Sequence, residues 1–425
     1  MKGDEKKRLL TRREFLRRGV TLAAASVTVP TFLSRTAWAM QNPYDAPLVS
    51  SKPGIPDDHV LLVVQLSGGN DGVNTVIPYR HDRYYQLRPT LSIAKDSIIR
   101  LSYEIGLHPG LVAFKNLIDQ GVLSIVQGVG YPNPNRSHFR SMEIWQTGVS
   151  DGYETTGWIG RVFDHVCNNA HLEHCSPTLG ISVGNTLNPS LRGENGIGVA
   201  VQDPERLFRM TQLYAHTHRQ ENAALTSGNT RANAQLEFLR RTALNAELSA
   251  DKIRRSVRQV QNHTDYPKTP FARGLKLIAG MIAGGLDTRV YYISMTGFDT
   301  HANQHGQHER LLKMLAEGIA AFQNDLDKLG QAERVVGMTF SEFGRRVAEN
   351  GSRGTDHGKA APMFIFGKPV KAGLIGEHPS LDNLANGDLQ FHTDFRSVYA
   401  TLLQDWLGVE AEEILGQRFD KLDLV

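Results

Sequence analysis

Five short apolar segments, separated by amphipathic ones, constrain the fold of this chain more than any other feature. Each is rich in β-branched or aromatic residues and is bounded by glycine or polar turns, which is typical of a buried strand. They span residues 59–67, 122–129, 289–295, 334–340 and 362–366. Helical patterns occupy residues 109–120, 271–286, 308–329 and 394–407. This alternation predicts an α/β fold, a three-layer α/β/α sandwich with a mostly parallel central sheet.

The segment from 203 to 262 does not follow the alternation. It is long and polar, its pattern is helical, and Asn, Ser and Gly interrupt it at 227–233. We therefore expect a helical insertion or cap at 203–262, within one α/β domain that spans residues 59–425. Residues 40–58 are interpreted as a linker.

The N-terminal segment has the features of a twin-arginine export signal. An Arg12-Arg13 pair is followed by a mild apolar run and by a small-residue cleavage site after Ala39. The run is too short and too rich in Ser and Thr to span a membrane. We expect residues 1–39 to direct the chain to the twin-arginine machinery, and the mature chain to reach the periplasm or cell exterior without a membrane span. Because that machinery carries folded proteins, often loaded with a cofactor, the signal favours a bound metal.

Net charge and cysteine content further limit the possible classes of function. The formal net charge of +3 lies partly in the signal, so nothing in the composition calls for a nucleic-acid partner. Cys167 and Cys175 are interpreted as a disulfide or as two free thiols. The alternative is a soft-metal site with His171 and His174, and none of these interpretations is catalytic.

Polar residues follow the ends of the predicted strands, where open parallel sheets place their active sites. Those that we single out are Asn70 and Asp71; Arg136, Ser137, His138 and Arg140; Asp299, His301, His305 and His308; Arg345; Asp356 and His357; Lys359; and His392. Each of these residues, considered alone, also has a purely structural interpretation. Asp71 and the Asp356-His357 pair suit polar turns, Ser137 suits a helix cap, and the three histidines after Asp299 suit one solvated helix face. The functional hypothesis depends on their joint placement.

Carboxylates and imidazoles without cysteine suit zinc, manganese, calcium or magnesium. One or two such ions would clamp the oxygens of a displacement at phosphorus or a similar centre. A metal-bound Ser137 hydroxyl would then act as the nucleophile, with Thr75 and Ser67 as alternatives. The cations that we expect to hold an oxyanion are Arg136, Arg140, Arg345 and Lys359, and Asn70 is a further candidate for substrate binding.

Several motifs resemble an exported bacterial family called domain of unknown function 1501. They are SGGNDGVNTVIP, GLHPGL, GYPNPNRSHF, SEFGRR with ENGSRGTDHG, and FRSVYATLLQDWLG. The resemblance extends from about residue 59 to residue 408.

The order of these residues also resembles, more distantly, the alkaline phosphatase superfamily, which includes sulfatases. This resemblance implies an alkaline-phosphatase-like fold and two metal sites. One would contain Asp71, Ser137, Asp356 and His357; the other would contain Asp299, a histidine of the following segment, and His392. Two features depart from the pattern. Asn303 stands four residues beyond Asp299, where the superfamily commonly has a histidine, and the arylsulfatase formylglycine motif is not visible around either cysteine or Ser137.

Two functions from different classes follow. The leading hypothesis is an exported metal-dependent hydrolase of phosphate or related sulfate esters, acting on a small-molecule or glycan substrate. The alternative is a non-catalytic, metal-stabilised scaffold or binding protein of a cell-envelope assembly. The Asn303 departure and the lack of a nucleophile signature motivate the alternative.

Overall fold

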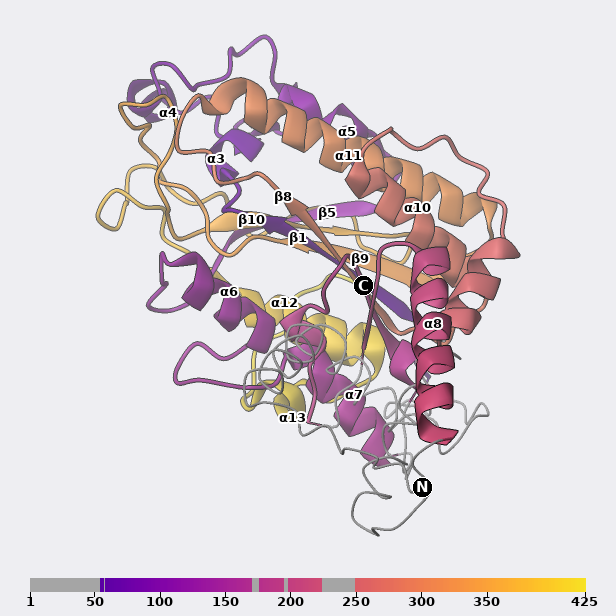
Figure 1. The fold of residues 1–425 in the computed structure, drawn as a ribbon. Helices are drawn as coiled ribbons and strands as arrows, with labels where there is room; N and C mark the ends of the chain where they lie inside the picture. Colours follow the sequence, from indigo (N-terminus) through magenta and orange to yellow (C-terminus); the bar gives the residue numbers. More distant parts are fainter. Residues whose placement is uncertain (1–53, 57, 170–175, 195–197, 224–248) are drawn as a thin grey trace, which may run out of the picture.

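A nine-stranded sheet forms the centre of the protein (Figure 1). The computed structural model describes residues 54–56, 58–169, 176–194, 198–223 and 249–425. The strands lie in the order β11-β5-β10-β9-β1-β8-β6-β7, and β12 pairs with β5. Their bounds are β1 Val60–Ser67, β5 Leu123–Gly130, β6 Gly180–Val183, β7 Val199–Val201, β8 Val290–Thr296, β9 Val335–Phe340, β10 Ala361–Phe366, β11 Gly373–Ile375 and β12 Thr393–Asp394. All five predicted strands are present. The four that were not predicted are only two to four residues long, too short to show a hydrophobic period.

Strand β1 lies between β8 and β9 and runs parallel to both. Its side chains alternate between two cores, as the pleat of a strand requires. Val60, Leu62 and Val64 pack on one face, whereas Leu61 and Val63 pack on the other. A strand covered on both faces must be apolar throughout, which explains the continuous run in its sequence.

Helices cover both faces of the sheet (Figure 1). One core contains residues of α5 (Val112–Asp119), α10 (Pro270–Ala283) and α11 (Gln304–Lys328). The opposite core contains residues of α6 (His138–Thr147), α7 (Trp158–Asn169), α12 (Phe395–Thr401), the π-helix Leu402–Leu407 and α13 (Ala411–Leu415). The predicted three-layer α/β/α sandwich is confirmed.

Strand β10 is antiparallel to both of its neighbours, β5 and β9. The other printed pairings in this sheet are parallel, so β10 alone is reversed among its described strands. The N-terminal end of β10 therefore lies at the edge of the sheet where its parallel neighbours end. This reversal brings residues 354–360, which precede β10, to the same edge as the loops that follow β1, β5, β8 and β9.

A small antiparallel sheet accompanies the main one. It has the order β2-β4-β3, with β2 Val76–Ile77, β3 Ile99–Arg100 and β4 Gly106–Leu107. Helix α3 (Gly72–Thr75) connects β1 to β2, and α4 (Asp82–Leu87) lies between β2 and β3. A third, smaller core joins the region to Val347 and Leu389. This subdomain delivers Arg88, which directly follows α4, to the polar edge of the main sheet.

Several predictions lie partly or wholly outside the described residues. These are the export signal 1–39, most of the linker 40–58, and residues 224–248 of the expected insertion. The flanking parts of that insertion, α8 (Pro204–Ala223) and residues 249–258, are helical. Cys167 is disulfide-bonded, whereas Cys175, His171 and His174 are outside the described residues. No helix in the described part of the chain has the length and apolarity needed to cross a membrane.

Candidate metal centre

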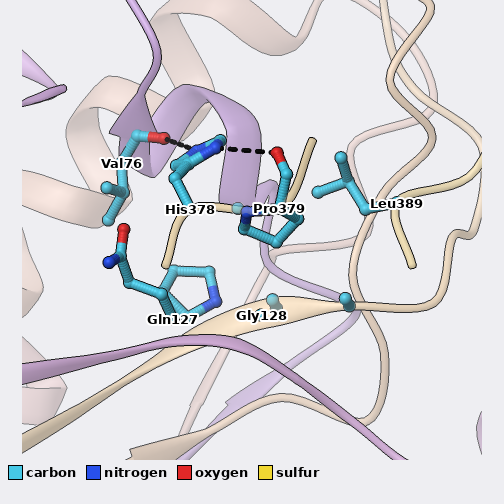
Figure 2. A pocket seen from close by; sticks show the side chains of 10 residues that line it. Val76, Gln127, Gly128, His378, Pro379 and Leu389 are labelled. Carbon is cyan, nitrogen blue, oxygen red and sulfur yellow. Dashed lines mark hydrogen bonds between the residues drawn. The ribbon is translucent and has the colours of Figure 1, made fainter. Parts of the chain in front are cut away.

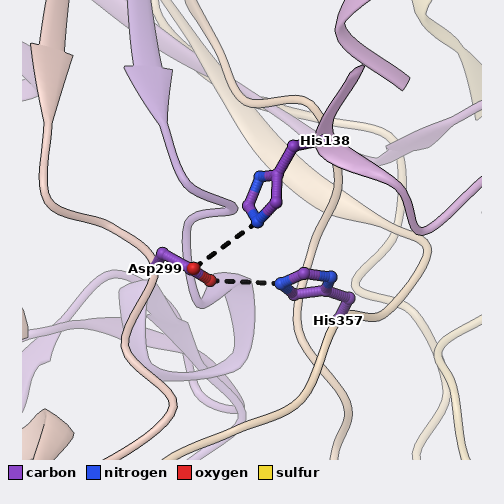
Figure 3. Close-up of side chains that lie close together, drawn as sticks. All are labelled: His138, Asp299 and His357. Atoms are coloured by element: carbon purple, nitrogen blue, oxygen red, sulfur yellow. Dashed lines mark hydrogen bonds and ion pairs between the residues drawn. The ribbon is translucent and has the colours of Figure 1, made fainter. Parts of the chain in front are cut away.

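Three histidines and one aspartate meet at the polar edge of the sheet. Asp299 and His301 lie in the loop after β8, His357 lies in the segment before β10, and His138 is the first residue of α6. His138, Asp299 and His357 each direct a ligand atom to one place, where these atoms lie within 4.8 Å of one another (Figure 3). The cluster is accessible to solvent, because the side chains of His138, Asp299 and His301 are 39%, 44% and 43% exposed.

The Asp299 carboxylate is the centre of the cluster. Its Oδ1 atom lies 3.1 Å from Nε2 of His357 and 3.0 Å from Nε2 of His301. These two Nε2 atoms are 2.9 Å apart. On the other side of the carboxylate, Oδ2 lies 3.4 Å from Nε2 of His138. All three imidazoles therefore present the same nitrogen to the same carboxylate.

The opposite nitrogen of each ring contacts an oxygen that can only accept a hydrogen bond. Nδ1 of His138 lies 2.9 Å from Glu342, Nδ1 of His301 lies 3.4 Å from Asp356, and Nδ1 of His357 lies 2.9 Å from the Arg136 carbonyl. With the hydrogen of each neutral ring on Nδ1, where these oxygens accept it, each Nε2 atom has a lone pair that faces Asp299.

Converging lone pairs repel one another unless a positive ion lies among them. A proton on one ring would satisfy one of these contacts, whereas a metal ion would satisfy them together. Histidine ligands of metals are usually held through the other ring nitrogen by a carboxylate or carbonyl, which is the arrangement at all three histidines here. The residues present therefore fit a divalent metal ion.

Charges at the cluster lead to the same conclusion. Burial raises the pKa of Asp299, but Arg345 and the adjacent histidines outweigh it and bring the pKa to about 2. Burial lowers the pKa of His357, which favours the neutral ring. Counting the histidines as neutral, the three carboxylates of Asp299, Glu342 and Asp356 outnumber the guanidiniums of Arg345 and Arg346 that act on them. This excess of negative charge favours a bound cation.

Arg345 organises the loops of the cluster. Its guanidinium is buried and donates hydrogen bonds to the carbonyls of Gly68, Gly69, Phe298 and Thr355 as well as to Asp299. These groups belong to the loops after β1 and β8 and to the segment before β10. We predicted Arg345 as an oxyanion ligand. In the structure it joins three loops and contacts Asp299.

Two glycines allow the loops to approach this closely. Gly68 has φ of +122°, and a Cβ atom there would lie 2.3 Å from the backbone nitrogen of Asp299. A Cβ atom on Gly354 would lie 2.1 Å from the backbone carbon of His301. Any side chain at either position would push the loop of Asp299 away from its neighbours.

Asp71 is held by a buried arginine and does not reach the cluster through any described contact. Its carboxylate forms two hydrogen bonds with Arg88, at 2.6 and 2.9 Å, and both side chains are fully buried. It also accepts a hydrogen bond from Gln304 and caps α3. The neighbouring Asn70 accepts from His308 and from Thr75, so these three predicted residues are buried together beside Asp71.

Other predicted residues lie around the cluster without joining it. Ser137 is exposed, precedes His138, and makes no capping hydrogen bond with its side chain. Arg136 forms an ion pair with the buried Asp388, and Arg140 donates to the carbonyls of Ser150 and Gly152. Lys359 is partly buried, two residues beyond His357, and no contact within the described chain joins its side chain to the cluster.

The Asp356-His357 pair does not direct both side chains to one point. His357 faces Asp299, whereas Asp356 contacts the far nitrogen of His301 and accepts a hydrogen bond from Asn350 at 3.1 Å. Asn303, which occupies the position expected for a histidine, is the N-cap of α11 with φ of +46°. His301, two residues earlier, lies beside Asp299 instead. His305 is exposed in the first turn of α11.

His392 lies near a different hollow, a small pocket lined by Gln127, Gly128, His378 and Pro379 among others (Figure 2). The His392 ring packs on Gly128, where a Cβ atom would lie 2.2 Å from its Nε2. The volume of this pocket is about 10 Å³, room for about one water molecule. Both ring nitrogens of His378 lie 3.0 Å from backbone carbonyls. This pocket is too small for an ester substrate.

The buried Asp71–Arg88 pair predicts a dependence of stability on pH. Burial raises the pKa of Asp71, but Arg88 outweighs it and lowers the pKa to about 2, below the ordinary 3.8. The unfolded chain therefore binds this proton at higher pH, and the stabilisation is lost as pH falls toward 2. We expect a loss on the order of 2 kcal/mol from this group between about pH 5 and 2. Across that pH range, the free energy of unfolding of a D71N/R88M variant should change less steeply with pH than that of the wild type. An equal slope would contradict the assigned role of the Asp71–Arg88 pair.

Four contributing residues were absent from the predicted site. His138 was noted beside Ser137 but was not assigned to the metal, and Glu342, Arg88 and Gln304 were not singled out. The position of His138 next to Ser137, the proposed nucleophile, was a signal that could have identified it. Glu342 and Gln304 carry no local signal, because their partners His138 and Asp71 lie 204 and 233 residues away. Arg88 is 17 residues from Asp71, a separation that no helix or strand period connects.

A family model described as "Protein of unknown function (DUF1501)" matches residues 124–417, well over half of the chain. The chain belongs to the DUF1501 family. The region of the DUF1501 match contains all four residues of the cluster, together with Glu342, Asp356 and Arg345. Asp71 and Arg88 lie before it. No curated protein matches the chain in sequence.

Solved structures resemble this DUF1501 chain only partly. A protein in the alkaline phosphatase superfamily from Vibrio parahaemolyticus is 10% identical, with a TM-score of 0.39, and the alignment covers 92% of this chain and 80% of that one. The PsFucS1 sulfatase from Pseudoalteromonas sp. is 11% identical, with a TM-score of 0.37 and coverage of 92% and 74%. Ps i-CgsB, solved in complex with k-i-k-neocarrahexaose, is 9% identical, with a TM-score of 0.41 and coverage of 86% and 75%. The sheet order and the layers of this chain establish its fold without these neighbours.

Proposed function

We propose that this DUF1501 protein is an exported, metal-dependent hydrolase of phosphate or sulfate esters. The convergence of three Nε2 atoms on Asp299, with every Nδ1 beside an acceptor, is the observation that carries the proposal. His138, Asp299, His301 and His357 would hold the ion. Their partial exposure supports access for an ester from solvent.

The donor set favours one ion of zinc or manganese. Imidazole nitrogens suit these metals, whereas calcium and magnesium prefer oxygen ligands throughout. Such an ion, when bound, supplies positive charge that stabilises the oxyanion of the reacting ester and lowers the pKa of a bound hydroxyl or water. Asp71 and His392 would not contribute to it, because they are directed elsewhere.

Ser137 is our candidate nucleophile. It lies at the start of α6, immediately before His138, and its hydroxyl is exposed and not used as a helix cap. Arg136, on its other side, has a guanidinium that is 43% exposed and a carbonyl that holds His357. These neighbours would place the Ser137 hydroxyl between a cation that attracts the substrate anion and the metal-binding histidines.

Metal analysis combined with a Ser137→Ala variant tests the proposal. Protein purified from the cell envelope should contain about one zinc or manganese ion per chain and hydrolyse members of a panel of phosphate and sulfate esters. S137A should retain the metal, because the residue is not among the four proposed ligands, and should lose at least about a hundredfold in kcat. The Ser150→Ala variant is a matched control, since Ser150 contacts Arg396 outside the cluster.

Three outcomes are informative. Folded wild-type protein without bound metal would overturn the proposed centre. Bound metal without hydrolysis of any ester would favour the scaffold or binding protein. Hydrolysis that survives in S137A would leave the metal centre in place but remove Ser137 as the nucleophile.

A further inference from the structure

Gln304 is buried beside the metal centre and connects three of its surrounding segments. It is the first residue of α11 and its exposed fraction is 0%. Its side-chain oxygen accepts hydrogen bonds from the hydroxyls of Thr300, at 3.0 Å, and Thr355, at 2.6 Å. Its side-chain nitrogen donates to Asp71. One amide thus contacts the loop after β8, the segment before β10 and the loop after β1.

The orientation of this amide is determined by its partners. Asp71 is paired with Arg88, so its carboxylate is ionised and can only accept hydrogen bonds. The NH₂ group of Gln304 must therefore face Asp71, and its oxygen must face the two threonine hydroxyls. Asp71 is itself fixed, because Arg88 also donates to the backbone carbonyls of Arg346 and Val347.

Both threonines belong to the segments that carry the proposed ligands. Thr300 lies between Asp299 and His301, and Thr355 lies two residues before His357. The backbone nitrogen of Thr355 donates to the carbonyl of Thr300 at 3.2 Å, so the two segments are joined directly at this point. These two segments carry His301 and His357, whose Nε2 atoms lie 2.9 Å apart.

We propose that Gln304 is a positioning residue of the metal centre, which sets the separation of the two ligand-bearing segments by holding Thr300 and Thr355 on a fixed Asp71. This inference rests on the proposed metal site. It also assigns Asp71 a supporting role: the carboxylate anchors the amide that holds the ligand loops and does not bind the ion. An outer partner of this kind typically accounts for ten- to a hundredfold in metal affinity.

Gln304→Met tests this role, because methionine keeps the length of the side chain and removes its hydrogen bonds. We expect the affinity for Zn²⁺, measured by competition with a chromophoric chelator, to fall roughly ten- to a hundredfold. With Co²⁺ as a spectroscopic probe, the visible absorption band should change in position and intensity, because the ligand geometry relaxes. Gln323→Met is the matched control: Gln323 is buried in the same helix, and its Nε2 has no partner among the described residues. Its Zn²⁺ affinity and Co²⁺ spectrum should remain those of the wild type.

Thr355→Val provides a second, milder variant in case Q304M does not fold. Valine keeps the shape of threonine and removes only the hydroxyl that Gln304 accepts from. A weaker Zn²⁺ affinity together with an altered Co²⁺ spectrum in T355V would support the role on its own. Wild-type affinity and spectrum in every variant that folds would overturn it and leave the metal centre intact. If the wild type binds no Zn²⁺, the metal centre and this role fail together, which the wild-type titration alone reveals.

Discussion

Replacing Asp299 by Asn should abolish tight metal binding and, with it, ester hydrolysis. The carboxylate is the one acidic group that the three Nε2 atoms share, and asparagine offers the cluster no negative charge. The loss of Zn²⁺ affinity should exceed the roughly hundredfold that loss of an outer partner costs. The fold should survive, because asparagine has nearly the same volume and its oxygen can still accept from Arg345. Chelator competition and elemental analysis measure the effect, and circular dichroism checks the fold.

Asp382 offers a matched control for this variant. Like Asp299 it is exposed and contacts a histidine and an arginine, His81 at 3.2 Å and Arg83 at 3.4 Å, but it lies outside the cluster. D382N should bind the metal as the wild type does. If D299N also retains one tightly bound ion, the metal lies elsewhere and the cluster is a hydrogen-bonded group of histidines.

Replacing Arg88 by Met should cost about 3–5 kcal/mol in the free energy of unfolding. Arg88 and Asp71 are both fully buried, so the variant leaves an ionised carboxylate in the interior without its partner. Among the described residues, the amide of Gln304 and the backbone nitrogen of Asn74 would remain as hydrogen-bond donors to that carboxylate. Urea denaturation near neutral pH gives the change directly, and a shift of the midpoint without a change in slope would show that stability alone has changed.

Two further variants isolate the buried charge as the cause. Arg83→Met removes a half-exposed arginine whose ion pair with Asp382 is 3.4 Å long, and should cost no more than about 1 kcal/mol. The D71N/R88M variant removes both charges and should regain much of the stability lost in R88M. A loss below about 1 kcal/mol in R88M would mean that the interior tolerates the unpaired carboxylate.

Much of the fold could be predicted because it depends on local patterns. Continuous apolar runs such as 59–67 identify strands that are buried on both faces, and the helical periods between them predict the two covering layers. The placement of polar residues after strands predicted which edge of the sheet would be polar. Asp299, His301 and His357 of the candidate site were found in this way.

Other features of the site could not be predicted, because they depend on contacts between distant segments. The direction of β10 decides that residues 354–360 share an edge with the loop after β8, and an apolar run is the same in either direction. Whether Asp71 faces an ion or an arginine depends on Arg88, which the small subdomain delivers. Asp71 and Asp299 follow strands in similar polar loops, yet one is buried against a guanidinium and the other is open to solvent.

The sequence by itself determined the elements, the layers and the chemical types gathered at one edge of the sheet, because burial and periodicity are encoded within a few residues. Only the tertiary structure decided which of those residues converge. His357 and Asp299 are 58 residues apart, and His138 and Glu342 are 204 apart. The orientation of an imidazole is set by whatever acceptor packs against its other nitrogen. That acceptor comes from another segment, so no local pattern of residues specifies it.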